Sequence, residues 1–447
     1  MIILFCYFQS IKYFVAEISL TRGGCVKKLL TLSLACVLFA SSIYAGGFQI
    51  NEHGARAMAL GGAFTGLAND PSAIYFNPAG ITQLKGTRFY FGTTAISPSA
   101  TYTSGSGSTA REYEMKGQLF TPINFYITQK LGDKLAVGLG VNNQYGLGTK
   151  WNGSWPGRYL AVNTEVKTFF ITPVIAYELF NGFSISAGGS FVFGDVTIER
   201  KLPNPLSPAL ADEEIAMAGD ATSFGFTAGI LYKVSDQFQF GVNYRSEVSL
   251  DFKGTATTTP ATFYHPILKV NLPFPNGDIT APLKTPQNLT VGLAYMPSDN
   301  VTFTADYQYI GWSSYDKLEV TFASYDLDLN PANGVQNVSS TPREYENTYI
   351  IRAGLEYKLS DNAALRAGLL YDHNPVQTDY IEPTLPDADR VGFNVGFGGK
   401  LTDNLGVDFS YMLLTFSERT VSKSKFGFNG TYSNLAHLFG VNFSYSL

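Results

Sequence analysis

The residues able to do chemistry in this sequence are sparse. There are four histidines, namely His53, His265, His373 and His437. None stands at the spacing of a metal site or of a nucleophile with its base. The three cysteines all fall within the first 36 residues. The sequence therefore predicts that the protein is not an enzyme and that it needs no metal or other cofactor.

Charged residues on strand-like segments carry a stronger signal. Strand parity predicts that several face away from the apolar side of their strands: Arg245, Glu247, Arg352, Glu356, Arg366, Asp372 and Asp408. We expect most of them to neutralise one another. An anionic ligand such as a carboxylate would, however, need a counter-charge among them wherever water is excluded.

The segments that position these charges alternate with period two. At the end of the chain, Phe439, Val441 and Phe443 face one way, and Gly440 and Asn442 face the other. The same alternation recurs after Gly86, for example in residues 224–234 and 238–245. One apolar and one polar face per strand fits a half-buried sheet or the wall of a lipid-facing barrel.

Turn lengths decide between these two architectures. Six tight turns alternate with seven long loops rich in Pro, Gly, Ser and Asn, which requires fourteen strands. The tight turns are at 131–134, 180–183, 234–237, 297–300, 359–362 and 401–404, and the loops at 98–118, 146–163, 201–220, 254–284, 323–344, 374–388 and 417–433. An even strand count with short turns at one end and long loops at the other is typical of outer-membrane barrels. The predicted fold is an all-β transmembrane barrel of fourteen antiparallel strands.

Composition agrees with export to a membrane. Aromatic residues make up 14% of the chain and charged residues only 15%, fewer charges than soluble proteins carry. The net charge of −5 excludes a nucleic-acid partner, which would require a basic surface. Absence of cysteine after residue 36 suits a chain that crosses an oxidising periplasm unfolded.

Residues 1–45 are predicted to be a signal peptide region. Lys27 and Lys28 precede an apolar run at 29–40, and small residues lead to a cleavage site between Ala45 and Gly46. The residues before 26 fit no exporter pattern. We expect them to be an over-extended start, with Val26 as the true initiator.

Residues 46–86 differ from everything that follows. Within "NDPSAIYFNPAG", at 69–80, proline, glycine and asparagine oppose both strand and long helix. The segment is nevertheless too apolar to remain in water, and irregular backbone at membrane depth is tolerated only inside protein or a wet cavity. We therefore predict a hatch, residues 46–86, folded into the lumen of a barrel formed by residues 87–447.

Several motifs resemble the FadL family of outer-membrane transporters of long-chain fatty acids and other hydrophobic compounds. They are "GGFQINEHGARAMALGGA" with "NPA" in the hatch, "NQYGL" (143–147), "IER" (198–200), "YRSEVSLDFKG" (244–254), "TLPDADR" (384–390) and "AHLFGVNFSYSL" (436–447). The resemblance covers essentially the whole chain after the leader. It implies a fourteen-stranded barrel with an N-terminal hatch, in agreement with the independent turn count.

The resemblance also implies functional residues. A kink in the third strand, at Asn143, Gln144, Tyr145 and Gly146, would open a lateral gap in the wall, and the hatch residues Asn77, Pro78 and Ala79 would rest against it as a latch. From the residues themselves, broken alternation and interior glycine near Gly146 indicate a bulge or a polar strand end.

Ligand-binding residues follow from the same resemblance. Arg200 matches the basic pocket residue of the family, while Asp372 and Arg390 fall on positions near the pocket. Arg343 stands beside the position of a second basic residue that this sequence lacks, and whether it substitutes stays open. Phe48 is the predicted apolar contact.

The implied function is passive import of hydrophobic compounds, with long-chain fatty acids as the expected ligand. Aromatic hydrocarbons are the alternative ligand within the family, and a general porin or an adhesin is the alternative of a different class. The expected partners are the hydrophobic small molecule, outer-membrane lipid and lipopolysaccharide. The protein is expected to be a monomer in the bacterial outer membrane.

Overall fold

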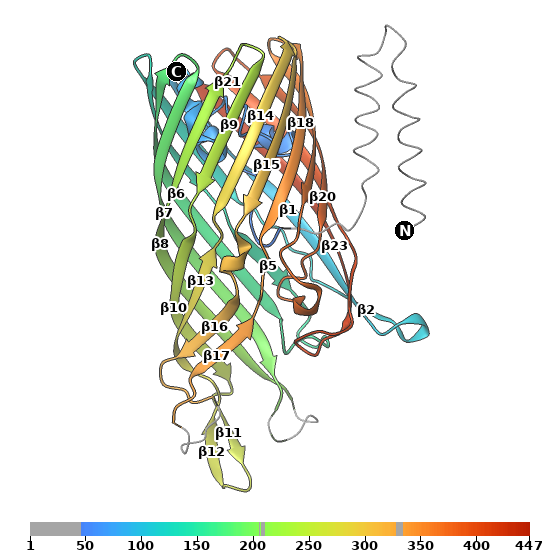
Figure 1. Cartoon of the computed structure of the whole chain (residues 1–447). Coiled ribbons are helices and arrows are strands. Elements are labelled where there is room, and N and C mark those ends of the chain that lie inside the picture. Colours follow the sequence, from blue (N-terminus) through green and yellow to red (C-terminus); the bar gives the residue numbers. More distant parts are fainter. Residues whose placement is uncertain (1–45, 205, 207–210, 328–333) are drawn as a thin grey trace, which may run out of the picture. The chain divides into compact units, whose positions relative to one another are not determined.

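The computed structural model describes residues 46–204, 206, 211–327 and 334–447. The predicted signal peptide, its cleavage site and the start at Val26 lie outside the described residues. From Thr87 onward the chain forms a closed antiparallel barrel of 14 strands, in which the last strand pairs with the first. Figure 1 shows the strands inclined around the lumen. The predicted fold class and strand count are confirmed.

Several wall strands are interrupted and therefore consist of two labelled segments. In chain order the wall is formed by β1 (Thr87–Ser104); β2 (Arg111–Glu114) with β3 (Ile123–Leu131); β4 (Leu135–Asn142) with β5 (Gly146–Lys150); β6 (Asn163–Phe180); β7 (Phe183–Leu202); β8 (Glu213–Lys233); β9 (Phe238–Arg245) with β10 (Val248–Thr259); β13 (Gly277–Thr285) with β14 (Asn288–Ser298); β15 (Val301–Ile310) with β16 (Lys317–Phe322); β17 (Val338–Pro342) with β18 (Thr348–Ser360); β19 (Ala363–Asp372); β20 (Arg390–Lys400); β21 (Leu405–Phe416) with β22 (Arg419–Val421); and β23 (Gly430–Ser446). A separate hairpin of β11 (Thr262–His265) and β12 (Val270–Pro273) extends from the loop between β10 and β13.

The two faces of the wall differ as the alternation predicts. On β23, Phe439 is 56% exposed on the outside, whereas Asn442 is fully buried in the lumen. Phe224 and Phe226 on β8 are likewise exposed. Outward apolar side chains suit lipid, while inward polar side chains bond one another or the hatch. Glu247 is an exception, because it lies exposed between β9 and β10 beside Lys284, so its predicted inward orientation is wrong.

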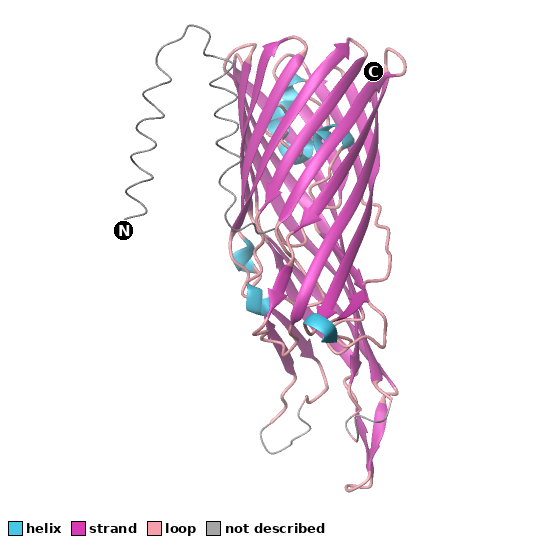
Figure 2. Cartoon of the chain, turned by 90° about the vertical axis from the view of Figure 1, so that its right-hand side faces the viewer, coloured by secondary structure: helices cyan, strands magenta, loops and turns pink. Residues whose placement is uncertain are grey.

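The hatch lies inside the barrel. Its helices are α3 (Ala55–Ala59), α4 (Ala73–Phe76) and the 3₁₀ helix η2 (Pro78–Gln83), all drawn within the lumen in Figure 2. Three further 3₁₀ helices belong to the external loops and strand ends: η3 (Gly107–Thr109), η4 (Trp312–Ser314) and η5 (Thr378–Tyr380). None of the helices in the described part of the chain has the length and apolar character needed to cross a bilayer.

Two parts of the hatch make different contacts. We call residues 47–51 the leading segment and residues 54–84 the plug. The plug fills the lumen near the short-turn end with fully buried side chains such as Phe64, Leu60 and Ile81. Glycines on the wall let its backbone approach closely: a Cβ on Gly368 would lie 2.2 Å from the nitrogen of Gly61. The wall is therefore shaped to accept the plug.

Candidate ligand site and wall opening

The third wall strand is broken between β4 and β5. Asn142 pairs with Phe170 of β6, and the ladder resumes where Gly146 pairs with Lys167. Residues 143–145 thus face only residues 168 and 169, which is the geometry of a β-bulge. The structure places the interruption at three of the four residues named for the kink, Asn143, Gln144 and Tyr145, with Gly146 as the first residue beyond it.

Side chains replace the lost backbone bonds at this bulge. Asn143 Nδ2 donates to the carbonyl of Thr168 at 2.6 Å, and Asn143 Oδ1 accepts from the amide of Ile123 at 2.9 Å. The Thr168 hydroxyl donates to the carbonyl of Tyr145 at 2.7 Å and accepts from its amide at 3.0 Å. One asparagine and one threonine therefore hold the bulge between its two neighbouring strands.

The leading segment pairs with the bulge from the lumen side. The Ile50 amide donates to Gln144 O at 2.9 Å, and the Gly146 amide donates to Phe48 O at 3.0 Å. Gln49 and Tyr145 form an antiparallel bridge between these bonds. At the break, residues 144–146 therefore form backbone hydrogen bonds with the leading segment.

A cavity of about 810 Å³ surrounds this contact, and we call it the kink cavity. Its lining includes the lumen residues Asp372 and Arg390 together with Ile123 and Phe169. The last two side chains are 47% and 41% exposed on the outer face of the wall. The lining therefore combines residues of the lumen with residues of the outer face of the wall beside the bulge. Phe120 also lines the cavity, with its ring over Gly148, where a Cβ would lie only 2.0 Å from the ring.

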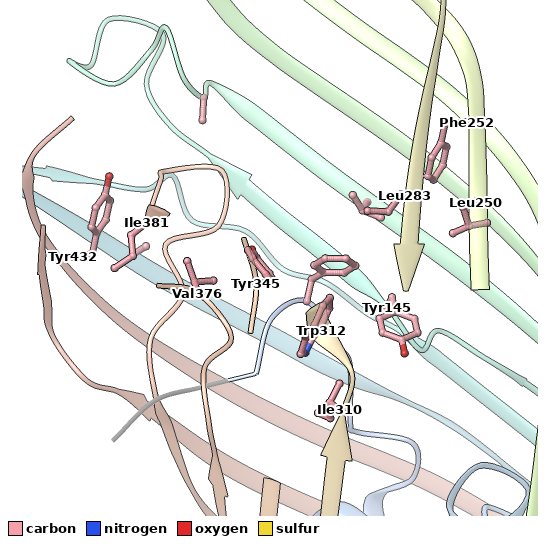
Figure 3. Close-up of a cluster of buried hydrophobic side chains, with 14 of the residues drawn as sticks. Tyr145, Leu250, Phe252, Leu283, Ile310, Trp312, Tyr345, Val376, Ile381 and Tyr432 are labelled. Carbon is pink, nitrogen blue, oxygen red and sulfur yellow. The ribbon is translucent and has the colours of Figure 1, made fainter. Parts of the chain in front are cut away.

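A second cavity, of about 260 Å³, lies among the external ends of the strands and is called here the arginine cavity. Its lining is largely aliphatic and aromatic, and includes Phe252, Leu283, Val320 and Phe322. Figure 3 shows Phe252 and Leu283 among the buried side chains of this region. Such a lining binds an apolar molecule, with a few polar groups to orient it.

Two arginines face the arginine cavity, and in the described part of the chain only Arg343 forms an ion pair with a carboxylate. Arg343 forms a buried ion pair with Glu382. Arg200 lines the same cavity, and its Nε is buried without a hydrogen-bond partner. Leaving a buried donor without a partner costs free energy, so Arg200 Nε is a candidate donor to a bound polar group.

Phe48 lines both cavities. Its ring is 6% exposed and packs edge-on against Trp312 at 4.7 Å and Tyr145 at 6.0 Å between centroids. In Figure 3, Trp312, Tyr145 and Tyr345 lie close to one another in the lumen.

Asp372 and Arg390 belong to the kink cavity rather than to the arginine cavity. They form an ion pair at 3.0 Å, and Arg390 also donates to the carbonyl of Gly47 at 3.3 Å. The Gly47 amide donates to Asp387 Oδ2 at 2.7 Å. Burial raises the pKa of the Asp387 carboxyl to about 7, against the opposing effect of Arg390. These side chains hold the chain directly before Phe48.

The predicted latch lies elsewhere. Asn77 Nδ2 donates to Ile230 O of β8 at 2.9 Å and to Thr65 O at 3.0 Å, while Asn77 Oδ1 accepts from the Ala79 amide at 3.3 Å. Pro78 begins η2, which packs mainly against β6, β7 and β8 and to a lesser extent against β4 and β3. The expectation that Asn77, Pro78 and Ala79 rest against the kink is therefore wrong. Asn77 bonds β8, which lies three wall strands along from the broken strand, and the leading segment occupies the bulge.

Three residues with clear structural roles escaped the sequence reasoning. Glu382 neutralises Arg343, Thr168 holds the bulge, and Phe120 covers Gly148. Glu382 lies in an irregular loop without periodicity, and Thr168 is one of many inward threonines. The one available signal was that strand alternation points Thr168 into the lumen opposite the predicted break.

Comparisons with known proteins agree with this architecture. The family model described as outer membrane protein transport protein (OMPP1/FadL/TodX) matches residues 36–447. The long-chain fatty acid transport protein of Escherichia coli K12 is 25% identical over 454 residues, covering 93% of this chain and 97% of that protein. Outer membrane protein P1 of Haemophilus influenzae is 25% identical over 477 residues, covering 93% and 98%.

Solved structures share the fold. A FadL homologue of Pseudomonas aeruginosa superposes with a TM-score of 0.74 at 21% identity, covering 90% of this chain and 100% of the other. The toluene transporter TodX of Pseudomonas putida superposes with a TM-score of 0.69 at 17% identity, covering 91% and 99%. The family match over residues 36–447 shows that the chain belongs to the OMPP1/FadL/TodX family, which consists of bacterial outer-membrane transport proteins and not of enzymes.

Proposed function

We propose that the protein passively imports hydrophobic carboxylates, with long-chain fatty acids as the ligand class. The route begins at the external loops, enters the arginine cavity, passes Phe48 into the kink cavity and leaves sideways between the strands at the bulge. No energy source is needed, because the ligand moves down its concentration gradient.

The observation that carries the proposal is the unpaired Nε of Arg200 in an apolar cavity. The Arg343–Glu382 pair contributes no net charge, so one positive charge remains among Arg200, Arg343 and Glu382. A carboxylate with a long apolar tail satisfies both the charge and the aliphatic lining. In this proposal the ligand carboxylate pairs with Arg200, and Arg343 stays paired with Glu382.

The lateral route is supported by the shared lining of the two cavities. Phe48, Leu147, Val166 and Leu385 line both, so the cavities are neighbours. The kink cavity then reaches Ile123 and Phe169 on the lipid side. A path straight to the periplasm would instead have to pass the packed side chains of the plug.

Binding measurements on Arg200→Met test the ligand class. The variant should bind oleate about tenfold or more weakly, because a charge-assisted hydrogen bond contributes about 1.5–3 kcal/mol. Its affinity for the matching uncharged alcohol should stay unchanged. Lys201→Met is the matched control, since Lys201 pairs with Glu214 and does not line the cavity. Equal loss of both ligands would contradict the carboxylate proposal.

Aromatic hydrocarbons are the second candidate. The arginine cavity is lined in part by aromatic rings, including Tyr315, Tyr345 and Phe426, and solved structures of toluene transporters share the fold. A transporter-deleted host carrying this gene separates the candidates by growth on oleate or on toluene. Growth on neither, with free passage of small sugars, would favour a general porin. An adhesin role of the loops would show as cell binding without uptake.

A further inference from the structure

The hairpin β11–β12 presents an apolar tip that the import route does not use. It forms its own two-stranded sheet, pairing Thr262 with Pro273 through His265 with Val270. In Figure 1 it projects from the barrel at the end opposite the C-terminus. Ile267 is 84% exposed and Leu268 59%, and the neighbouring Tyr264 and Val270 are about half exposed.

The exposure of this tip is built into the fold of the hairpin. The Lys269 amide donates to His265 O at 2.8 Å, and the Leu268 amide donates to His265 Nδ1 at 3.2 Å. His265 therefore accepts both hydrogen bonds that close the turn. At the base, the Phe274 amide donates to Ala261 O at 2.9 Å, and the ring of Phe274 is buried. The tip is therefore held away from the barrel while its base is packed.

The charge of the hairpin is opposite to that of the whole protein. The chain carries a net charge of −5, yet residues 255–277 contain no Asp or Glu. The side chains of this stretch that can carry a positive charge are Lys269, at the tip, and His265. Exposed aliphatic side chains next to a lysine can bind the surface of an aggregate of anionic amphiphiles. The aliphatic side chains leave water among the acyl tails, and the lysine pairs with the anionic headgroups.

We infer that the hairpin tip docks on aggregates of long-chain carboxylates and brings the external mouth of the barrel to its ligand in that form. The inference rests on the proposed function for the identity of the amphiphile. Ile267 and Leu268 enter the acyl region of the aggregate, and Lys269 lies among the carboxylates. A lipopolysaccharide surface fits less well, because its sugars keep an apolar tip away from the acyl chains.

The tip can be followed by fluorescence of the full chain in nanodiscs. Leu268→Trp places an indole at the tip, and the emission of the native Trp151, Trp155 and Trp312, which are at most 3% exposed, is measured in the unmodified protein under the same conditions. Vesicles of phosphatidylcholine containing ionised oleate should shift the new emission to the blue, and brominated lipid should quench it. Ser106→Trp, exposed in the loop between β1 and β2, should show neither change.

Vesicle co-sedimentation gives a second readout that keeps the native tip. I267S/L268S should bind oleate vesicles about tenfold more weakly, because two aliphatic side chains no longer leave water. Val335→Ser, at a residue 67% exposed in another external loop, is the matched control and should bind like the unmodified protein. Lys269→Glu should abolish the preference for oleate vesicles over pure phosphatidylcholine.

Several outcomes would overturn the inference. These are no spectral shift with oleate vesicles, equal binding to charged and uncharged vesicles, tighter binding to lipopolysaccharide vesicles, or a shift that depends on protein concentration without vesicles, which would identify a second copy as the occupant. Uptake of monomeric oleate separates this inference from the proposed function. If that uptake persists without vesicle binding, only the docking role fails, and if vesicle binding persists without uptake, only the import proposal fails.

Discussion

The plug and the leading segment are consecutive in sequence, but the barrel holds them in different ways. The plug is anchored by buried ions: Arg56 of α3 pairs with Glu356 at 2.9 Å, and Glu356 also accepts from Arg366 at 2.6 Å. Wall side chains further bind its backbone, as where Asn442 Oδ1 accepts from the Ala55 amide at 2.8 Å. The leading segment contains no charged side chain; it is held by backbone bonds to the bulge, to Asp387 and to Arg390, and by Asn51 Oδ1, which accepts from Arg352 at 3.0 Å.

This difference assigns the two parts different mechanical roles. Releasing the plug would leave charged groups buried without partners, which costs several kcal/mol for each group. Releasing the leading segment separates no ion pair, and the hydrogen bonds it breaks lie beside a cavity, where water or ligand can replace them. We therefore expect the plug to stay in place during transport, while residues 47–51 are the part that moves. The following predictions test this contrast, from the largest expected effect to the smallest.

Glu356→Ala should have the largest effect, because it removes the carboxylate shared by Arg56 and Arg366. Loss of one partner from a buried ion network costs about 3–5 kcal/mol. We expect a lower unfolding temperature and the appearance of single-channel conductance in planar bilayers as the plug loosens. Asp403→Ala, in an exposed short turn, is the control. A closed and equally stable variant would show that the plug is not held by these ions.

Gly146→Phe should block the side exit without disturbing the plug. A Cβ at Gly146 would lie 2.8 Å from Ile50 Cδ1, and the added ring would fill the kink cavity. Uptake should fall about tenfold or more, because a steric conflict of this kind costs about 1–3 kcal/mol and also obstructs the path. Gly189→Phe, where no atom lies within 4 Å of a Cβ, is the matched control and should transport normally. Unchanged uptake in Gly146→Phe contradicts the lateral route.

Asn77→Ala should loosen the plug locally. The variant deprives the carbonyls of Thr65 and Ile230 of their side-chain donor. We expect a loss of about 1–3 kcal/mol in stability, with correct barrel assembly, measured by thermal unfolding of the purified protein. If the barrel fails to assemble, Asn77 has a larger role in folding than its hydrogen bonds indicate.

Phe48→Ala should act selectively on the rate of ligand exchange, which is the smallest effect of this series on transport. Removal of the ring joins the arginine cavity to the kink cavity. Bound oleate should dissociate about tenfold faster, as expected when a barrier falls by about 1.4 kcal/mol. Phe48→Leu, which keeps an apolar side chain at the partition, should restore slow exchange in stopped-flow measurements. An unchanged rate in Phe48→Ala would mean that the ring is not the barrier.

The sequence alone determined the wall of this protein. Period-two alternation and tight turns act over a few residues, so strand number, the lipid-facing side of segments such as 439–447 and the position of the hatch before the first strand could be derived locally. The broken alternation at Asn143 and Gln144 was visible for the same reason. Strand parity gave the wrong orientation for Glu247, because residues 246 and 247 lie between β9 and β10 and do not continue the strand.

Only the tertiary structure decided which residues of the lumen pair with one another. Arg343 meets Glu382 across 39 residues, and Arg56 meets Glu356 across 300, although no local pattern links either pair. The bulge contacts Phe48 and Ile50 rather than Asn77, because the folding of the hatch inside the closed wall determines which hatch residue reaches which strand. Closing a barrel brings every inward side chain near many partners from other strands, and packing and charge pairing then select among them.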